Sequence, residues 1–225
     1  MIKKKNFFLW AFIFIILTTY SINSTHKKQN SFLPIKFIQI DGTLNSNKLE
    51  IRNKLNELKG RNIIFVGHNK FKELVGKVDF VKEIKVKKIY PDTIKVTVTE
   101  FKPIGLFVDK NNIKFLLTDE GKIITNYESN KFESLPLVYG EESKKKFHIF
   151  YKSLENIGFE TNLIKKLNYF DINRWDIILK NGKVIKLPTT KYENSLKKFL
   201  TIFNKIEFSD FQVFDFRIKG ELILR

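Results

Sequence analysis

The chain has 225 residues, of which 43% are hydrophobic and 29% are charged, a composition typical of a folded protein with room for about two domains. It contains no cysteine, which excludes disulfide bonds, thiolate nucleophiles and Cys-based metal sites. The formal net charge of +17 comes mostly from lysines spread along the whole chain. We interpret it as a compositional bias and predict no nucleic-acid partner, because no basic cluster alternates with aromatic residues.

The N-terminal region predicts a membrane segment. Residues 7–22 are uncharged and mainly apolar, and they follow three consecutive lysines, Lys3 to Lys5. Their length lies between that of a spanning helix and that of a signal-peptide core. No Ala-x-Ala cleavage pattern follows, which favours an uncleaved anchor over a cleaved signal or a buried helix of a soluble protein. The positive-inside rule then predicts a cytoplasmic tail over 1–6, a transmembrane helix over 7–22 and a tether over 23–34, with the rest of the chain across the membrane.

The segment after the tether predicts a small α+β domain. Residues 35–40 are rich in β-branched and aromatic side chains and end at an Asp-Gly turn, which indicates a strand. Asn47, with Glu50 three residues later, is typical of a helix start, and an apolar face repeats from there to Gly60. A shorter helix over 70–76 and two strands over 81–89 and 93–100, joined at a Pro-Asp turn, are predicted next. The expected order is β-α-(β)-α-β-β, with both helices on one face of a small sheet.

These elements carry motifs of a known family. They are Gly-Thr at 42–43, Val-Asp-Phe-Val-Lys at 78–82, and the run from Ile89 to Pro103, which contains Tyr-Pro-Asp-Thr and ends in Glu-Phe-Lys-Pro. Residues 35–104 therefore resemble the POTRA domain of the FtsQ (DivIB) family of bacterial cell division proteins, although any small α+β domain would share the element order. The resemblance implies a protein-docking module next to the membrane. An unpaired edge of a small sheet can accept an extended partner segment.

The remaining residues, 105–225, predict a second domain built mainly from strands. Short apolar runs separated by turn residues indicate strands, and two amphipathic stretches indicate helices over 142–156 and 191–205. We therefore predict a mostly antiparallel sheet with two helices, so that the chain as a whole belongs to the α+β class. The predicted strands lie at 106–108, 113–117, 123–124, 135–140, 167–172, 175–179, 184–187, 211–216 and 221–224.

The second domain continues the resemblance. Its landmarks, in chain order, are Asp-Glu-Gly-Lys at 119–122, Leu-Pro at 135–136, Arg-Trp at 174–175, Asn-Gly at 181–182, Leu-Pro at 187–188 and Asp-Phe-Arg at 215–217. They are similar to those of the β domain of the same family. The resemblance implies a scaffold of the division machinery, the divisome, in the bacterial inner membrane at the septum. Its two large domains would be periplasmic, and its partners would be FtsB, itself paired with FtsL.

The resemblance also implies where the partner binds. The distal strand would accept an extended segment of FtsB, with help from the preceding helix. Replacing Ile223 by Pro would then remove a ladder donor and abolish the pairing. The implied partner-binding residues are Arg217, Ile218, Gly220, Ile223 and Arg225.

Purely structural interpretations of the same residues are left open. The terminal strand would then only pair inside its own sheet. Asp215 and Arg217 would form a structural ion pair that anchors a turn, and Arg174-Trp175 would belong to the core. Glu100 and Pro103 are expected to fix the corner between the domains.

No motif indicates catalysis. The three histidines, His26, His68 and His148, have no second ligand at a metal-binding spacing, and no nucleophile or phosphate-binding motif is present. We therefore predict no enzyme, no metal, no cofactor and no small-molecule substrate. Two other functions are left open: a POTRA-containing component of outer-membrane protein assembly or secretion, and a basic periplasmic binder of anionic lipid or murein.

Overall fold

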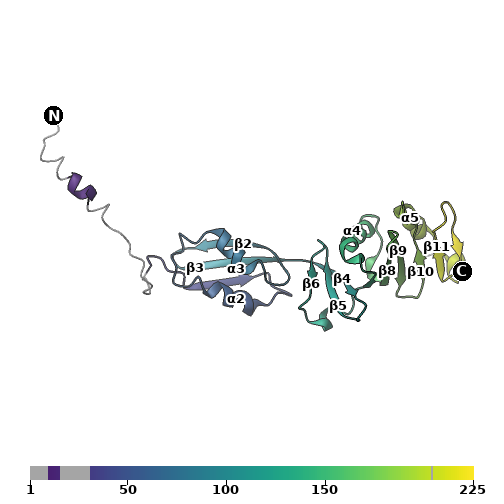
Figure 1. Ribbon diagram of the computed structural model, residues 1–225, viewed down its shortest axis with the longest axis horizontal. Helices are drawn as coiled ribbons and strands as arrows, with labels where there is room; N and C mark the ends of the chain where they lie inside the picture. Colours follow the sequence, from purple (N-terminus) through teal and green to yellow (C-terminus); the bar gives the residue numbers. More distant parts are fainter. Residues whose placement is uncertain (1–9, 16–30, 204) are drawn as a thin grey trace, which may run out of the picture.

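The computed structural model describes residues 10–15, 31–203 and 205–225 (Figure 1). Residues 10–15 are helical and belong to the predicted membrane segment. The rest of that segment, the tail over 1–6 and most of the tether lie outside the described residues. Among the described residues, no helix is both long and apolar enough to cross a membrane. The transmembrane helix therefore stays a prediction.

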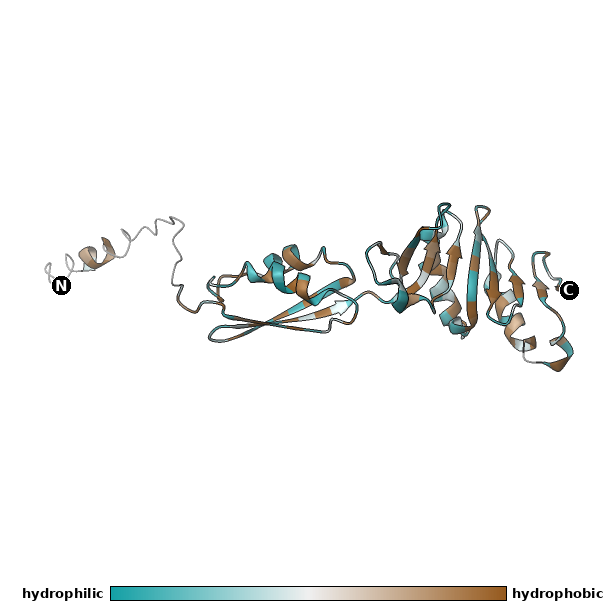
Figure 2. Ribbon diagram, turned by 90° about the horizontal axis from the view of Figure 1, so that it is seen from below, coloured by the Kyte–Doolittle hydropathy of each residue, from teal (hydrophilic) through white to brown (hydrophobic). Residues whose placement is uncertain are grey.

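The first domain is a three-stranded sheet with two helices, as predicted. Its strand order is β1-β3-β2, with β1 parallel and β2 antiparallel to β3. Both helices lie on the same face of this sheet (Figure 2). The optional extra strand between the helices is absent from the described residues, and only an isolated bridge joins Pro34 and Asn62 there. The elements are β1 (Phe37–Asp41), α2 (Lys48–Asn56), α3 (His68–Val75), β2 (Val81–Ile89) and β3 (Thr93–Glu100).

Capping and turn chemistry fix the start of this domain. The Asn47 side chain accepts hydrogen bonds from the backbone N–H groups of Leu49 and Glu50, so it caps α2 as predicted. Gly42 has φ +82°, and a Cβ atom there would lie 2.2 Å from the carbonyl oxygen of Val98. Only glycine therefore fits this turn after β1. The helices then bury their apolar faces against alternate residues of the strands, and the core includes Ile51, Leu55, Phe71, Val75, Ile84, Ile94, Val96 and Val98.

The second domain contains a nine-stranded sheet with the order β12-β11-β10-β9-β8-β7-β4-β5-β6. Most neighbouring strands are antiparallel, as predicted, but β4–β7, β7–β8 and β10–β11 are parallel. The strands are β4 (Pro103–Val108), β5 (Lys114–Thr118), β6 (Ile123–Ile124), β7 (Leu137–Tyr139), β8 (Ile164–Phe170), β9 (Arg174–Leu179), β10 (Val184–Lys186), β11 (Val213–Asp215) and β12 (Ile223–Leu224). The helices are α4 (Ser143–Asn156) and α5 (Tyr192–Ile202), with short 3₁₀ turns at η1 (Ser129–Phe132), η2 (Thr161–Leu163) and η3 (Ile206–Phe208).

One face of this large sheet carries the main core. The residues in register across the middle of the sheet are buried beneath α4 and α5. Trp175 is 5% exposed and stacks on Phe150 of α4, with ring centroids 4.6 Å apart. The core interpretation of Trp175 is therefore confirmed. The buried row consists of Val138, Leu167, Ile177, Ile185 and Phe214.

The two domains follow one another along the long axis of the molecule (Figure 1), and side chains from both pack together at their junction. Phe80, just before β2, leaves the first core and joins a small cluster with Leu106, Leu116, Ile124 and Phe132 of the second domain. Lys82 of β2 also forms an ion pair with Glu120 in the loop between β5 and β6. Glu100 and Pro103 are the residues expected to fix the corner between the domains. Glu100 accepts hydrogen bonds from the loop over 44–46 within the first domain, and Pro103 opens β4.

Candidate partner-binding site at the end of the sheet

Strand β12 is one edge of the nine-stranded sheet and lies at the end farthest from the first domain (Figure 1). It pairs antiparallel with β11, with Phe214 opposite Leu224 and Asp215 opposite Ile223. Its other side has no neighbouring strand among the residues that the structure describes. The terminal strand therefore pairs inside its own sheet on one side and has a free edge on the other. Internal pairing and partner binding are thus compatible for this strand.

The hydrogen-bond pattern shows which residues of this edge face outward. The Arg225 N–H donates to the carbonyl of Val213 over 3.1 Å, and the Val213 N–H donates to the carbonyl of Arg225 over 2.9 Å. Hydrogen-bonded and non-bonded pairs alternate along antiparallel strands. Ile223 and Arg225 therefore use their backbone groups within the sheet, whereas those of Leu222 and Leu224 point to the free edge.

This pattern corrects the expected effect of the Ile223→Pro substitution. A proline at Ile223 would remove a donor that points to β11, so it would damage the sheet itself and would not report on a partner. The informative position is Leu224, because its N–H lies on the free edge, where a proline is tolerated by the fold.

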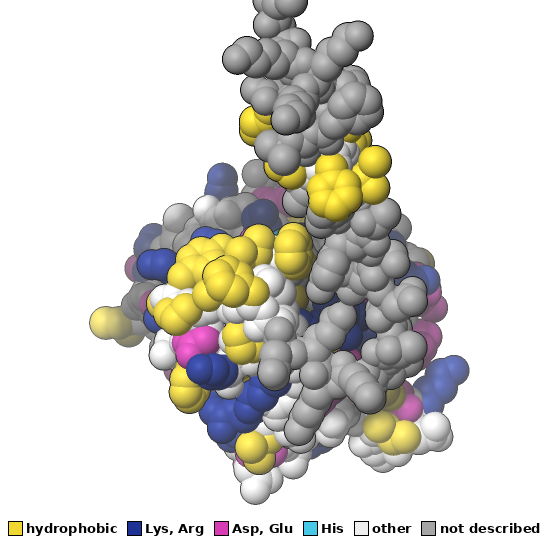
Figure 3. All heavy atoms as spheres, turned by 90° about the vertical axis from the view of Figure 1, so that its left-hand side faces the viewer, with side chains coloured by type: hydrophobic (Ala, Val, Ile, Leu, Met, Phe, Trp, Pro, Cys, Tyr) yellow, Lys and Arg dark blue, Asp and Glu magenta, His cyan; other side chains and the backbone are white. Residues whose placement is uncertain are grey.

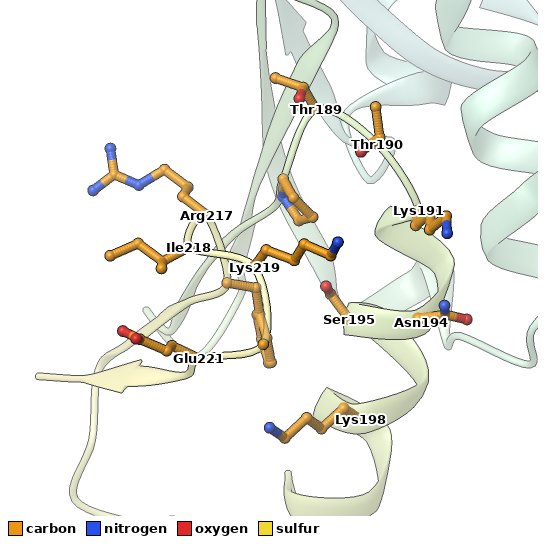
Figure 4. A pocket seen from close by; sticks show the side chains of 13 residues that line it. Thr189, Thr190, Lys191, Asn194, Ser195, Lys198, Arg217, Ile218, Lys219 and Glu221 are labelled. Carbon is orange, nitrogen blue, oxygen red and sulfur yellow. The ribbon is translucent and has the colours of Figure 1, made fainter.

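The loop between β11 and β12 stands opposite the start of α5. A hollow of about 650 Å³ lies between them, and it is lined by residues 188–191, 194, 195, 198 and 216–221. Lys219 points across this hollow toward α5, and Lys198 reaches from α5 toward the loop, whereas Arg217 and Ile218 point away from it (Figure 4). The hollow thus holds basic groups that suit an acidic side chain of a bound segment.

An ion pair holds the base of this loop. The buried Asp215 carboxylate accepts from Nη2 and Nε of Arg217 over 2.6 and 2.9 Å, and from the Arg217 backbone N–H over 3.1 Å. The hydrogen bonds from Arg217 lower the pKa of Asp215, although burial acts in the opposite direction. The predicted ion pair between Asp215 and Arg217 is therefore confirmed. Arg217 fixes the turn that leads into β12.

A second carboxylate lies in the same row of the sheet. Lys186 of β10 is in register with both Asp215 of β11 and Asp176 of β9. Burial raises the pKa of Asp176, although Arg174, Lys186 and Arg217 partly counteract it. The Arg174 Nε and Asp176 Oδ1 atoms are 3.4 Å apart, but neither has a hydrogen-bond partner in the described part of the chain. Asp176 is thus held less firmly than Asp215.

The β2 edge of the small sheet is less suited to a partner. Strand β2, an edge of the small sheet, exposes Lys82, Lys85 and Lys87 along its length, and lysines on an edge strand oppose pairing with another chain. By contrast, residues 222–224 on the β12 edge are all uncharged. The β12 edge therefore combines free backbone groups with apolar side chains that partly pack on the core.

Comparison with known proteins identifies the family. Residues 33–101 match the family model of the FtsQ-type POTRA domain, and residues 107–217 match that of the C-terminal part of the cell division protein FtsQ/DivIB. The chain belongs to the FtsQ/DivIB family. This family consists of non-enzymatic cell division proteins, in agreement with the lack of a catalytic motif in the sequence.

Individual relatives agree with this family. The chain is 26% identical over 154 residues to cell division protein FtsQ of Rhizobium meliloti (strain 1021), covering 68% of this chain and 50% of that protein. It is 24% identical over 202 residues to FtsQ of Methylomonas methanica, covering 86% and 78%, and 28% identical over 119 residues to FtsQ of Caulobacter vibrioides (strain NA1000 / CB15N), covering 53% and 39%. The chain thus spans about half the length of several FtsQ relatives that it matches.

The structure brings the predicted partner residues together at one end of the sheet. Arg217, Ile218 and Gly220 lie in the loop before β12, Ile223 lies in β12, and Arg225 is the last residue of the chain. The FtsQ/DivIB match ends at residue 217, so their role as a partner surface stays a prediction. Sequence reasoning missed Leu222, Leu224, Lys198 and Lys219. The alternating Leu-Ile-Leu run indicates a strand but does not show which backbone groups are already bonded.

Proposed function

We propose that this chain is a membrane-anchored scaffold of the bacterial divisome that binds other division proteins through its exported domains. Membership of the FtsQ/DivIB family supports this role, and the relatives named above are cell division proteins. The proposed organisation is an inner-membrane helix over 7–22, a POTRA domain over 35–104 and a partner-binding domain over 105–225 at the septum. The proposed partners are FtsB and FtsL.

The free edge of β12 is the observation that carries the proposed binding mode. An extended partner segment would add a strand beside β12 and bond to the outward backbone groups of Leu222 and Leu224. Because only a few hydrogen bonds fit on so short an edge, side-chain contacts must supply much of the affinity. Ile218 is 51% exposed beside this edge, and Lys198 and Lys219 would attract acidic side chains.

Capture of partners by the full-length protein tests this proposal. Membranes of the same cell are solubilised, and proteins retained on the tagged full chain are identified at low and high salt. Recovery of FtsB- and FtsL-type proteins that persists at high salt supports the scaffold, because backbone pairing is weakly screened. Recovery only of lipid or murein that is lost at high salt would contradict it and favour the basic binder left open above.

Two variants localise the contact within the same experiment. Leu224→Pro removes an outward N–H and should abolish recovery of the FtsB-type protein. Leu224→Ala truncates the same side chain but keeps the outward N–H, so it serves as the matched control and should retain the partner. Thermal unfolding shows whether both variants are folded, and retention of the partner by folded Leu224→Pro would exclude the β12 edge.

A further inference from the structure

The end of the first domain that faces away from the second domain exposes several large apolar side chains. Phe65 is 83% exposed, Phe32 80%, and Phe37 and Tyr90 59% each. Soluble proteins rarely leave so many neighbouring apolar side chains in water without a function. Figure 3, which views this end of the molecule, shows hydrophobic side chains gathered together with Lys and Arg side chains beside them. We call this surface the aromatic tip and define it by Phe32, Phe37, Ile64, Phe65, Ile89 and Tyr90.

Three separate segments meet to form the aromatic tip. Strands β1 and β3 begin here and β2 ends here, because β1 and β3 are parallel and β2 is antiparallel to β3. The loop after α2 is tied to the incoming chain, since the Ile63 N–H donates to the carbonyl of Leu33 over 3.0 Å. Lys88 ties the same loop to β2 by donating to the carbonyl of Ile64 over 2.9 Å. The fold therefore holds these apolar side chains in place as one surface.

The surroundings of the aromatic tip are basic. The three segments, 31–37, 59–66 and 86–93, contain five basic residues and one acidic residue, Asp92. Asp92 already faces Lys36, with 3.8 Å between Nζ and Oδ2. A hollow of about 430 Å³ on the flank beside Phe37 is lined by Lys36, Arg52 and Lys59. Apolar and aromatic side chains ringed by lysines are the composition of surfaces that sit in the interface of an anionic bilayer.

The chain itself places this surface near the proposed membrane segment. Residues 10–15 are helical and apolar, and only residues 16–30 separate them from Ser31 at the tip. A fully extended stretch of that length spans at most roughly 55 Å. The described chain enters the first domain at the aromatic tip, so the tip is the part of the domain that follows the proposed anchor first along the chain.

We propose that the aromatic tip docks on the interface of an anionic phospholipid bilayer and fixes the tilt of the first domain on the membrane. Phe32, Phe65 and Tyr90 would lie at the level of the headgroups, and the surrounding lysines would bind their phosphates. The second domain would then project from the membrane and present β12 at a set height. This inference rests on the proposed membrane anchorage, because the anchor supplies the high local concentration of lipid.

Labelling of single cysteines tests the proposal on the full-length protein. Since the chain contains no cysteine, one introduced Cys carries a bimane label at a unique position. The label is placed at Phe65→Cys in the tip, at Leu44→Cys as an equally exposed control (86%), or at Phe12→Cys in the proposed anchor. The protein is reconstituted in phosphatidylcholine vesicles with and without phosphatidylglycerol, and quenching by lipids with nitroxide-labelled chains is measured.

Stronger quenching at position 65 than at position 44, increasing with phosphatidylglycerol, is the expected result. Equal quenching of the labels at positions 65 and 44 would overturn the proposal. This holds even if position 65 is covered by a protein partner in the cell, because the vesicles contain only this protein. The label at position 12 tests the anchor separately, since a failed anchor leaves it unquenched whatever position 65 shows. Phe32→Ser with Ile64→Ser should remove the quenching at 65, whereas Leu44→Ser with Leu49→Ser should not. Unchanged quenching in the tip variant would show that the label alone contacts lipid and would also overturn the proposal.

Discussion

Phe80 of the first domain stacks on Phe132 of the second, with ring centroids 5.9 Å apart and an angle of 18° between the rings. Phe80 is 3% exposed and has φ +66°, a backbone conformation that is rare for a bulky side chain. This strained backbone conformation turns the Phe80 ring away from the core of the first domain and into the second. The contact makes the junction a packed interface, so the position of β12 relative to the first domain depends on it.

The Phe80→Ala substitution tests this junction. We expect a loss of about 3 to 5 kcal/mol in the free energy of unfolding, because the cluster around Phe132 loses a buried ring. Small-angle scattering should also show a wider range of domain arrangements. Phe32→Ala is the matched control, because Phe32 is 80% exposed and should change neither quantity. Unchanged stability and scattering in Phe80→Ala would show that the two domains are independent.

Glu100 should make the first domain sensitive to acid. Its carboxylate accepts from the backbone N–H groups of Leu44, Asn45 and Ser46 over 2.8 to 3.1 Å. Burial alone would raise the pKa of Glu100, but the hydrogen bonds from these residues outweigh it and lower the pKa. A lowered pKa means that the stabilisation is present above the unfolded-state pKa of about 4.3 and is lost as the pH falls through the folded-state pKa.

The Glu100→Gln variant measures this contribution. Denaturant unfolding at pH 7 should show a loss of about 1 to 2 kcal/mol, a value reduced for the partial exposure of the carboxylate. The difference from the unsubstituted protein should disappear at acidic pH, where Glu100 is protonated. Glu83→Gln on exposed β2 is the control. A difference that does not depend on pH would show that shape, and not charge, is what the loop over 44–46 requires.

The Asp215–Arg217 pair should control the titration of Asp215. In the Arg217→Ala variant, burial acts on the carboxylate without its main hydrogen-bond donor, so the pKa of Asp215 should rise. In the unsubstituted protein the pair stabilises the fold above the unfolded-state pKa of about 3.9, and this stabilisation is lost as the pH falls through the lowered folded-state pKa. With the pKa raised, less of this stabilisation remains in the variant at neutral pH.

Carbon-13 NMR of the Asp215 carboxyl group follows this titration directly. Arg217→Lys keeps the positive charge but loses the bidentate geometry, so its titration should fall between those of the other two proteins. An Asp215 titration that is the same in all three proteins would mean that the turn before β12 is held by the backbone alone.

Gly42 and Gly60 form a natural pair for separating backbone strain from steric clash. Both have φ +82°, but a Cβ at Gly42 would lie 2.2 Å from the Val98 carbonyl oxygen, whereas a Cβ at Gly60 would contact nothing within 4 Å. Gly60→Ala should therefore cost about 1 kcal/mol for the left-handed backbone alone. Gly42→Ala should cost clearly more in thermal unfolding, and equal costs would exclude the clash.

Local patterns predict much of the first domain because its elements are regular and its pairings are close in sequence. The strands predicted over 81–89 and 93–100 have the same bounds in the structure, and the predicted cap at Asn47 is formed. The role of Phe80 was not predictable in this way. Its apolar side chain suits either core, and its direction is decided by a backbone angle that the sequence pattern does not reveal.

The arrangement of the second sheet and of the site depends on contacts distant in sequence. Strand β7 lies between β4 and β8 and is parallel to both, although its apolar run alone suggests only a short strand. At the site, the resemblance placed the predicted partner residues at the β12 end of the sheet. It did not indicate that the backbone groups of Ile223 are used internally while those of Leu224 are free, because this follows from the register with β11.

Hydrogen exchange at the backbone of β12 is the most direct test of the partner edge. The full-length protein is compared with and without the FtsB homologue of the same cell, and exchange is followed for each amide from Glu221 to Arg225. Pairing at the free edge predicts that the Leu222 and Leu224 amides become strongly protected on binding, whereas the Ile223 and Arg225 amides, already bonded within the sheet, change little. Binding of the homologue with no new protection at Leu222 and Leu224 would contradict strand addition at β12.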